Sequence, residues 1–270
     1  MKTNTRFILL TCLLLCFYAC DRKPYPQSLI IADSLASIQP DSAITLLKTL
    51  EDNIKTESES TQMYYRLLCI KANDKAYIRH TSDSLILPVL HYYIKQEDEE
   101  HLPEAYYYAG RVYRDLGDAP QALDYFEKSL ETLPKNKKPK LKSYIYSQMG
   151  TLFLYQGLYN EALEIFKKKY ACDIDLKDSV GIIYTLRDIA GTYRDINQKD
   201  SSIYYYQAAY DLGKELKRQD LINMVQSQIA GLYIQSKKYD LAKIALQDAL
   251  TDIKHSNKSG IYSIAAKLYH

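Results

Sequence analysis

A segment of 40 residues recurs four times from Ala105 onward, with its small and large residues in register. A fixed period of this size indicates a solenoid or array, in which each copy packs against its neighbours. Two columns of small residues alternate with two columns of large ones. Their members are Gly110, Gly150, Ala190 and Ala230; Tyr113, Phe153, Tyr193 and Tyr233; Ala122, Ala162, Ser202 and Ala242; and Phe126, Phe166, Tyr206 and Leu246.

The spacing of these columns predicts a hairpin of two helices in each copy. Intervals of three and four residues keep the column members on one helical face. The small residue on the first helix allows the second helix to cross closely, and large side chains fill the space beside it. Between the helices, Gly117 suits the turn and Asp118 is expected to cap the second helix, with Pro120 in its first turn. The sequence therefore predicts an all-α fold.

At these residues the chain resembles the tetratricopeptide repeat family, which places small and aromatic residues at the same offsets. The copy that matches most fully contains Gly110, Tyr113, Gly117, Ala122, Phe126 and Pro134. Later copies depart from the pattern, since Lys169 stands where the family has Ala and Pro134 has no counterpart. The period exceeds the family's own, so we expect the extra residues to lengthen the second helix or the link to the next repeat.

The resemblance covers roughly residues 26–270 and implies an α-solenoid that forms a right-handed superhelix with a ligand-binding concave face. Residues 27–98 are expected to form degenerate hairpins, in which Ala43 and Leu47 mark a second helix and Pro88 either begins or kinks a helix. Residues 99–257 are expected to form four regular hairpins. Residues 258–270 are expected to be the first helix of a further or capping hairpin.

The beginning of the chain has the pattern of a secretory signal. Lys2 and Arg6 precede the apolar residues 7–19, a run shorter than the ~20 residues that span a bilayer. Residues 1–19 are therefore expected to be a signal peptide, with an uncleaved membrane anchor as the alternative. The sequence FYAC, ending at Cys20, resembles the bacterial lipobox, although Phe17 and Tyr18 depart from it.

The lipobox resemblance implies that Cys20 is lipidated and that residues 20–26 are a tether. It implies a lipoprotein anchored to a membrane in the envelope of a Gram-negative-type bacterium, with a soluble exported protein as the alternative. Removing residues 1–19 would lower the basic residues from 35 to 33, equal to the 33 acidic residues. Nucleic-acid binding proteins usually have a basic excess or stripe, so we expect no nucleic-acid partner.

The sequence contains none of the motifs that carry catalysis or hold metals. HExxH, a Gly-rich phosphate loop, GxSxG and CxxC are all missing. We therefore expect no catalytic residue, no metal site and no cofactor. Cys69 and Cys172 lie about two repeats apart, too far for a disulfide, and are expected to be small buried apolar residues.

The family resemblance places the binding groove on the first helix of each hairpin. The candidate groove residues are Tyr107, Tyr108, Arg111, Arg114, Ser147, Gln148, Arg187 and Arg194. Tyr107 and Tyr108 are expected to face either the groove or an adjacent helix. Arginine binds carboxylates with two parallel hydrogen bonds, so the hypothesis is an extended, acidic peptide from a partner protein. The alternative is local pairing, because Arg187 and Arg194 each adjoin an Asp.

The sequence thus predicts a non-enzymatic scaffold that binds a protein or peptide. One alternative is a glycan-capturing outer-membrane lipoprotein, because the chain has 27 Tyr. It has no Trp, however, and no long inserted loop, which are the usual features of such proteins. Another alternative is the sensory N-terminal part of a longer membrane-bound regulator.

Overall fold

The computed structural model describes residues 25–134, 138–251 and 264–266, and this part of the chain is all-helical, without a strand. It divides into two compact units, Met1–Tyr92 and Tyr93–His270. The predicted signal peptide, Cys20 and the start of the tether lie outside the described residues. Within the described ranges, we find no helix with the length and apolar character needed to span a membrane.

The first unit contains three mutually packed helices, α2 (Gln27–Ile38), α3 (Pro40–Ile54) and α4 (Glu59–Lys75). Ala43 and Leu47 are buried in its core, as predicted for a second helix of a hairpin. Helix α5 (Ile86–Lys95) runs across the division between the units. Pro88 is the third residue of α5, so it lies in the first turn and begins the helix rather than kinking it.

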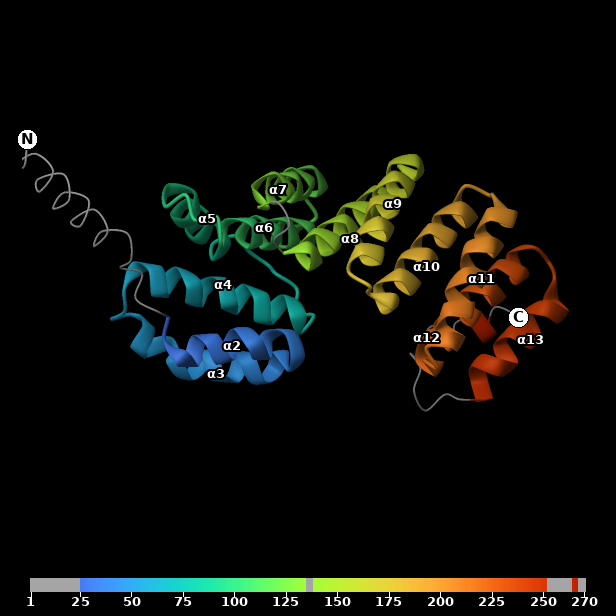
Figure 1. The fold of residues 1–270 in the computed structure, drawn as a ribbon, viewed down its shortest axis with the longest axis horizontal. Helices are drawn as coiled ribbons and strands as arrows, with labels where there is room; N and C mark the ends of the chain where they lie inside the picture. Colours follow the sequence, from blue (N-terminus) through green and yellow to red (C-terminus); the bar gives the residue numbers. More distant parts are fainter. Residues whose placement is uncertain (1–24, 135–137, 252–263, 267–270) are drawn as a thin grey trace, which may run out of the picture. The chain divides into compact units, whose positions relative to one another are not determined.

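Within the described residues, the second unit contains four successive helix pairs. They are α6 (Leu102–Leu116) with α7 (Ala119–Thr132), α8 (Pro139–Tyr155) with α9 (Tyr159–Asp175), α10 (Ser179–Asp195) with α11 (Lys199–Glu215), and α12 (Gln219–Gln235) with α13 (Tyr239–Thr251). Each of these helices contacts the next one along the chain, which is the arrangement of an α-solenoid (Figure 1). Residues 264–266 are also helical, and Ile264 packs against Ala230 and Leu246.

Within the hairpins, the column of small residues marks a close helix crossing, as predicted. A Cβ atom added to Gly110 would lie 2.5 Å from the ring of Phe126. In the next hairpin, a Cβ atom on Gly150 would lie 2.5 Å from the ring of Phe166. Both phenylalanine side chains are almost completely buried, so any larger residue at either glycine would displace a core ring.

The turns follow the predicted chemistry. Gly117 and Gly157 have φ of 88° and 74°, a left-handed conformation that glycine adopts without strain. The carboxylate of Asp118 caps α7 by accepting the backbone N–H of Gln121 at 3.1 Å. Pro120 lies in the first turn of α7.

The extra residues of the period lie in different places in different repeats. Helices α9 and α11 have 17 residues each, and a short turn follows each of them, so the second helix is lengthened. In the first repeat, α7 has 14 residues and a longer link leads to α8 at Pro139. Both of the predicted alternatives therefore occur.

The cysteine prediction is correct for pairing and wrong for complete burial. Cys69 and Cys172 are free, and each is only partly buried. Burial raises the pKa of the Cys69 thiol to about 11, so this thiol is neutral at ordinary pH.

Candidate binding face

Six polar side chains lie on the first helices of the four pairs, two or three residues before the small residue of the helix or four residues after it. We call them the polar row: Arg114, Gln148, Arg187, Asp188, Arg194 and Gln228. Helices α6, α8, α10 and α12 carry them, and each side chain is half-buried. The row is formed by the repeat itself, because the period returns the same helical face to the same side of the unit.

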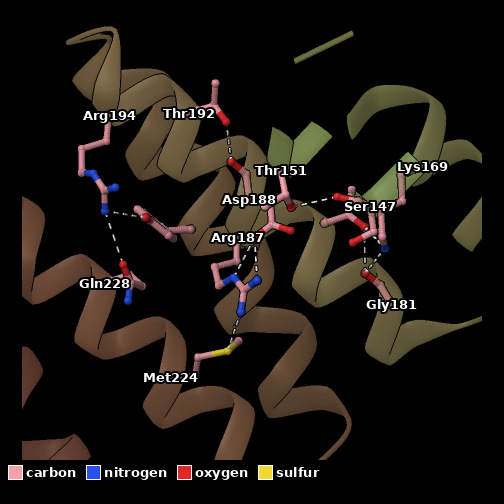
Figure 2. A network of polar contacts seen from close by, with 12 residues as sticks. Ser147, Thr151, Lys169, Gly181, Arg187, Asp188, Thr192, Arg194, Met224 and Gln228 are labelled. Atoms are coloured by element: carbon pink, nitrogen blue, oxygen red, sulfur yellow. Dashed lines mark hydrogen bonds and ion pairs between the residues drawn. The ribbon is translucent and has the colours of Figure 1, made fainter. Parts of the chain in front are cut away.

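Two hydrogen bonds in the polar row join one repeat to the next. Arg114 Nη1 on α6 donates to Gln148 Oε1 on α8 at 2.5 Å. Arg194 Nη1 on α10 donates to Gln228 Oε1 on α12 at 3.3 Å (Figure 2). Arg194 Nη1 also lies 3.4 Å from the hydroxyl of Tyr206. Burial raises the pKa of Tyr206 to about 12, so this hydroxyl is neutral.

Each arginine of the row is also paired with the aspartate that follows it. The distances between Nη2 and the carboxylate oxygen are 2.7 Å for Arg114 and Asp115, 2.6 Å for Arg187 and Asp188, and 2.9 Å for Arg194 and Asp195. The local pairing that the sequence left open is therefore present. The three arginine side chains nevertheless remain 27, 30 and 25% exposed.

The structure corrects the prediction for the two tyrosines. Tyr107 and Tyr108 are each only 2% exposed, so they belong to the core rather than to an accessible face. The ring of Tyr107 packs on Phe126 of α7, with centroids 5.9 Å apart, which is the adjacent-helix alternative. Ser147 and Arg111 are half-buried on α8 and α6, and the backbone carbonyl of Ser147 accepts the Thr151 hydroxyl at 2.8 Å.

Sequence reasoning did not identify Asp188 and Gln228 as members of the face. Both residues lie in the same repeat column as Gln148, two residues before the small residue of their helix. Extending the column from Gln148 along the repeats would have found them. Their partners depend on how adjacent helices pack, and the 40-residue pattern contains no information on that.

The described residues contain no group of three His, Cys, Asp or Glu side chains placed to hold a metal ion. What the polar row offers is hydrogen bonding: guanidinium N–H donors, amide groups and one carboxylate, held on a helical frame. Such a frame positions polar groups for recognition because neighbouring side chains restrict their rotamers.

Comparison with known proteins agrees with this architecture. Residues 103–136 match the tetratricopeptide repeat model. The match covers nearly all of α6 and α7, the helix pair with the fullest set of predicted family residues. No curated protein matches the chain.

Solved structures of other helical-repeat proteins have the same fold. The apo form of RapI has a TM-score of 0.73 at 14% identity, covering 89% of this chain and 70% of RapI. A signal transduction ATPase from Pyrococcus horikoshii with a tetratricopeptide repeat sensor has a TM-score of 0.70 at 18% identity, covering 89% of this chain and 36% of the ATPase. The Rap conjugation regulator of plasmid pLS20, in complex with the Phr* peptide, has a TM-score of 0.56 at 14% identity, covering 92% of this chain and 71% of the regulator.

These likenesses are of fold, at low sequence identity. The described part of the chain therefore has a fold of tetratricopeptide-like helical repeats.

Proposed function

We propose that this protein is a non-enzymatic scaffold that binds an extended segment of a partner protein along the polar row. The observation that carries the proposal is the set of three guanidinium groups, each a quarter to a third exposed and each held by an aspartate. A group already held in one geometry loses less conformational entropy when a ligand binds, so the row is preorganised for recognition.

We further propose that the bound segment carries acidic side chains facing Arg114 and Arg194. Both guanidinium groups have more N–H donors than their protein partners use, and carboxylates fit such donors well. Asp115 and Asp195 offset the positive charge of the two arginines. Direct hydrogen bonds to the guanidinium groups therefore contribute more to the binding free energy than the net charge of the face does. The peptide complex of the pLS20 regulator supports the choice of a peptide ligand, since that protein has a similar helical-repeat fold.

We also propose that lipidation of Cys20 anchors the scaffold to a membrane of the cell envelope. The support is the apolar segment before Cys20 and its lipobox-like ending. Each buried methylene of an acyl chain contributes ~0.8 kcal/mol, so two or more chains would hold the protein firmly. Cells that express the wild-type chain should incorporate labelled fatty acid into it, whereas the Cys20→Ser variant should remain unlabelled. Absence of label in the wild type contradicts the anchor.

The test of the binding face uses the full chain, purified in detergent, and a display library of random peptides. Enriched peptides should contain Asp or Glu, and Arg114→Ala combined with Arg194→Ala should weaken their binding about tenfold or more, because charge-assisted hydrogen bonds are lost. The salt dependence of binding should flatten in the same variant. Thermal unfolding should change little, since partly exposed ion pairs contribute ~0–1 kcal/mol.

The matched control removes two cations from second helices instead. Lys128 and Lys167 are paired with Asp124 and Glu164 within α7 and α9, away from the polar row. Lys128→Ala combined with Lys167→Ala changes the net charge equally and should leave peptide affinity unchanged. If no peptide is enriched, or if the two double variants behave alike, the proposed face is wrong.

A further inference from the structure

The polar row is interrupted at its centre. Where α8 and α12 carry Gln148 and Gln228, α10 carries Asp188. Gln148 and Gln228 each accept a hydrogen bond from an arginine one repeat earlier, Arg114 and Arg194. The residue at the corresponding position one repeat before Asp188 is Leu154, which has no side-chain donor. Among the described residues, the preceding repeat therefore donates no side-chain hydrogen bond to this central acceptor, although the ammonium group of Lys169 on α9 acts on it through its charge.

The carboxylate of Asp188 is only partly satisfied. Its Oδ1 atom accepts two hydrogen bonds from Arg187, from Nε at 2.9 Å and from Nη2 at 2.6 Å. Among the described residues, its Oδ2 atom has no hydrogen-bond partner. The side chain is 19% exposed, so the carboxylate is partly withdrawn from water and the site remains accessible from outside.

Arg187 is itself held in place by neighbours on two helices. Its guanidinium lies over the ring of Tyr184, with its centre 5.0 Å from the centroid, and its Nη1 lies 3.2 Å from Sδ of Met224 on α12 (Figure 2). Thioether sulfur is a weak acceptor, so Nη1 remains available to a better one. The pair thus presents N–H donors and one carboxylate acceptor side by side.

The charge balance indicates which ligand group fits this pair. Burial raises the pKa of Asp188 even with Arg187 beside it, so desolvation of the carboxylate is not fully compensated within the protein. A donor from a ligand would compensate it. The positive charge of Arg187 would repel a cationic donor. A neutral group with an N–H donor and an adjacent carbonyl fits both residues, because the N–H can donate to Asp188 and the carbonyl can accept from Arg187.

We propose that Arg187 and Asp188 form a subsite for the amide group of an Asn or Gln side chain of the bound segment. The amide NH2 donates to Asp188 Oδ2, and the amide oxygen accepts from the Arg187 guanidinium. This subsite rests on the proposed function and deepens it: the ligand presents an amide between two acidic groups, which face Arg114 and Arg194.

The test is a change of specificity in the same peptide selection. Asp188→Asn keeps an oxygen for Arg187 and replaces the free acceptor by an NH2 donor. Peptides enriched on the wild-type chain should contain Asn or Gln at one position relative to the acidic residues, and they should bind the variant about tenfold or more weakly. Asp220→Asn, which alters another arginine-paired carboxylate outside the row, should leave their affinity unchanged.

A second variant tests the subsite without altering its carboxylate. Leu154→Arg should restore the arginine that the flanking repeats carry, occupy Asp188 Oδ2 and block the amide. It should abolish the Asn or Gln preference. Because Leu154 also packs against the cluster around Phe166, circular dichroism should first show that the variant keeps its helical content. Enriched peptides that lack this preference, or that bind all variants equally, overturn the subsite alone. A library that yields no enriched peptide overturns the proposed function as well.

Discussion

Two successive junctions between repeats of the second unit are built from opposite chemistry. Where α8, α9 and α10 meet, buried polar side chains occupy four repeat columns beside a glycine; where α10, α11 and α12 meet, one repeat later, the same columns contain only apolar residues or glycine. The replacements along the columns are Ser143 by Ile183, Lys169 by Ala209, Asp173 by Gly213, Gly181 by Leu221 and Thr185 by Val225. We call these two sets the polar junction and the apolar junction.

The polar junction is a closed network around one carboxylate. Asp173 accepts the Ser143 hydroxyl at 2.6 Å on Oδ1, and Lys169 Nζ at 2.6 Å on Oδ2. The hydroxyl of Thr185 lies 2.6 Å from the same Nζ and 2.7 Å from the same Oδ2. The side chains of Lys169 and Asp173 are only 7 and 1% exposed, so both charges are withdrawn from water and depend on each other.

The apolar junction fills the same space with side-chain volume. Ile183, Leu221 and Val225 belong to one buried cluster. At Gly213, the missing side chain leaves room for Ile222, whose Cγ1 would lie 3.2 Å from an added Cβ. The same helix frame therefore accepts either a satisfied ion pair or close apolar packing. Removing only one of the two charged residues should destabilise the fold, because a buried charge without its partner raises the free energy of the folded state.

The largest effect should come from breaking the polar junction at its centre. Asp173→Ala leaves the ammonium group of Lys169 buried without a counter-ion, which costs ~3–5 kcal/mol. The urea midpoint should fall, and hydrogen exchange should accelerate in α9 and α10 before it does so in α11 and α12. Asp211→Ala removes an exposed carboxylate from α11 and should change stability by less than ~0.5 kcal/mol. Equal effects of the two variants would contradict a buried network.

Replacing the whole polar set should have a smaller effect of the opposite sign. The variant carries the residues of the apolar junction: Ser143→Ile, Lys169→Ala, Asp173→Gly, Gly181→Leu and Thr185→Val. Removing both charges together leaves none unpaired, so the variant should be as stable as the wild type or more stable by up to ~4 kcal/mol. Urea unfolding of both proteins measures the difference. A loss above ~1 kcal/mol would show that the network stabilises the junction more than packing does.

The smallest effect should come from adding a methyl group to the apolar junction. Gly213→Ala gains up to ~1 kcal/mol of helix propensity, offset by the contact with Ile222, so the net change should stay within ~1 kcal/mol. Gly191→Ala is the matched control, because its Cβ would meet only ordinary contacts, at 3.6 Å from the Tyr206 hydroxyl. The control should therefore be the more stable of the two by urea unfolding. The reverse order would show that the apolar junction is loosely packed.

The burial of two side chains, Lys169 and Tyr107, was predicted only in part from the sequence. Lys169 was identifiable as a departure from the family pattern, but its burial was not, because burial depends on Asp173, Ser143 and Thr185 arriving from three helices. Tyr107 was open to two placements for the same reason. One helix face touches both its hairpin partner and the next repeat, so periodicity alone does not say which neighbour covers a side chain.

The sequence by itself determined the features that depend on a few neighbouring residues. These are the helical hairpins, the close crossings at Gly110 and Gly150, the cap at Asp118 and the turn at Gly117. Each follows from backbone conformation or from spacing along one helix, which are local properties. Only the tertiary structure decided which polar groups meet across repeats. The hydrogen bond from Arg114 to Gln148, and the acceptor of Asp188 that has no partner among the described residues, depend on distances between helices, and those are set by packing rather than by period.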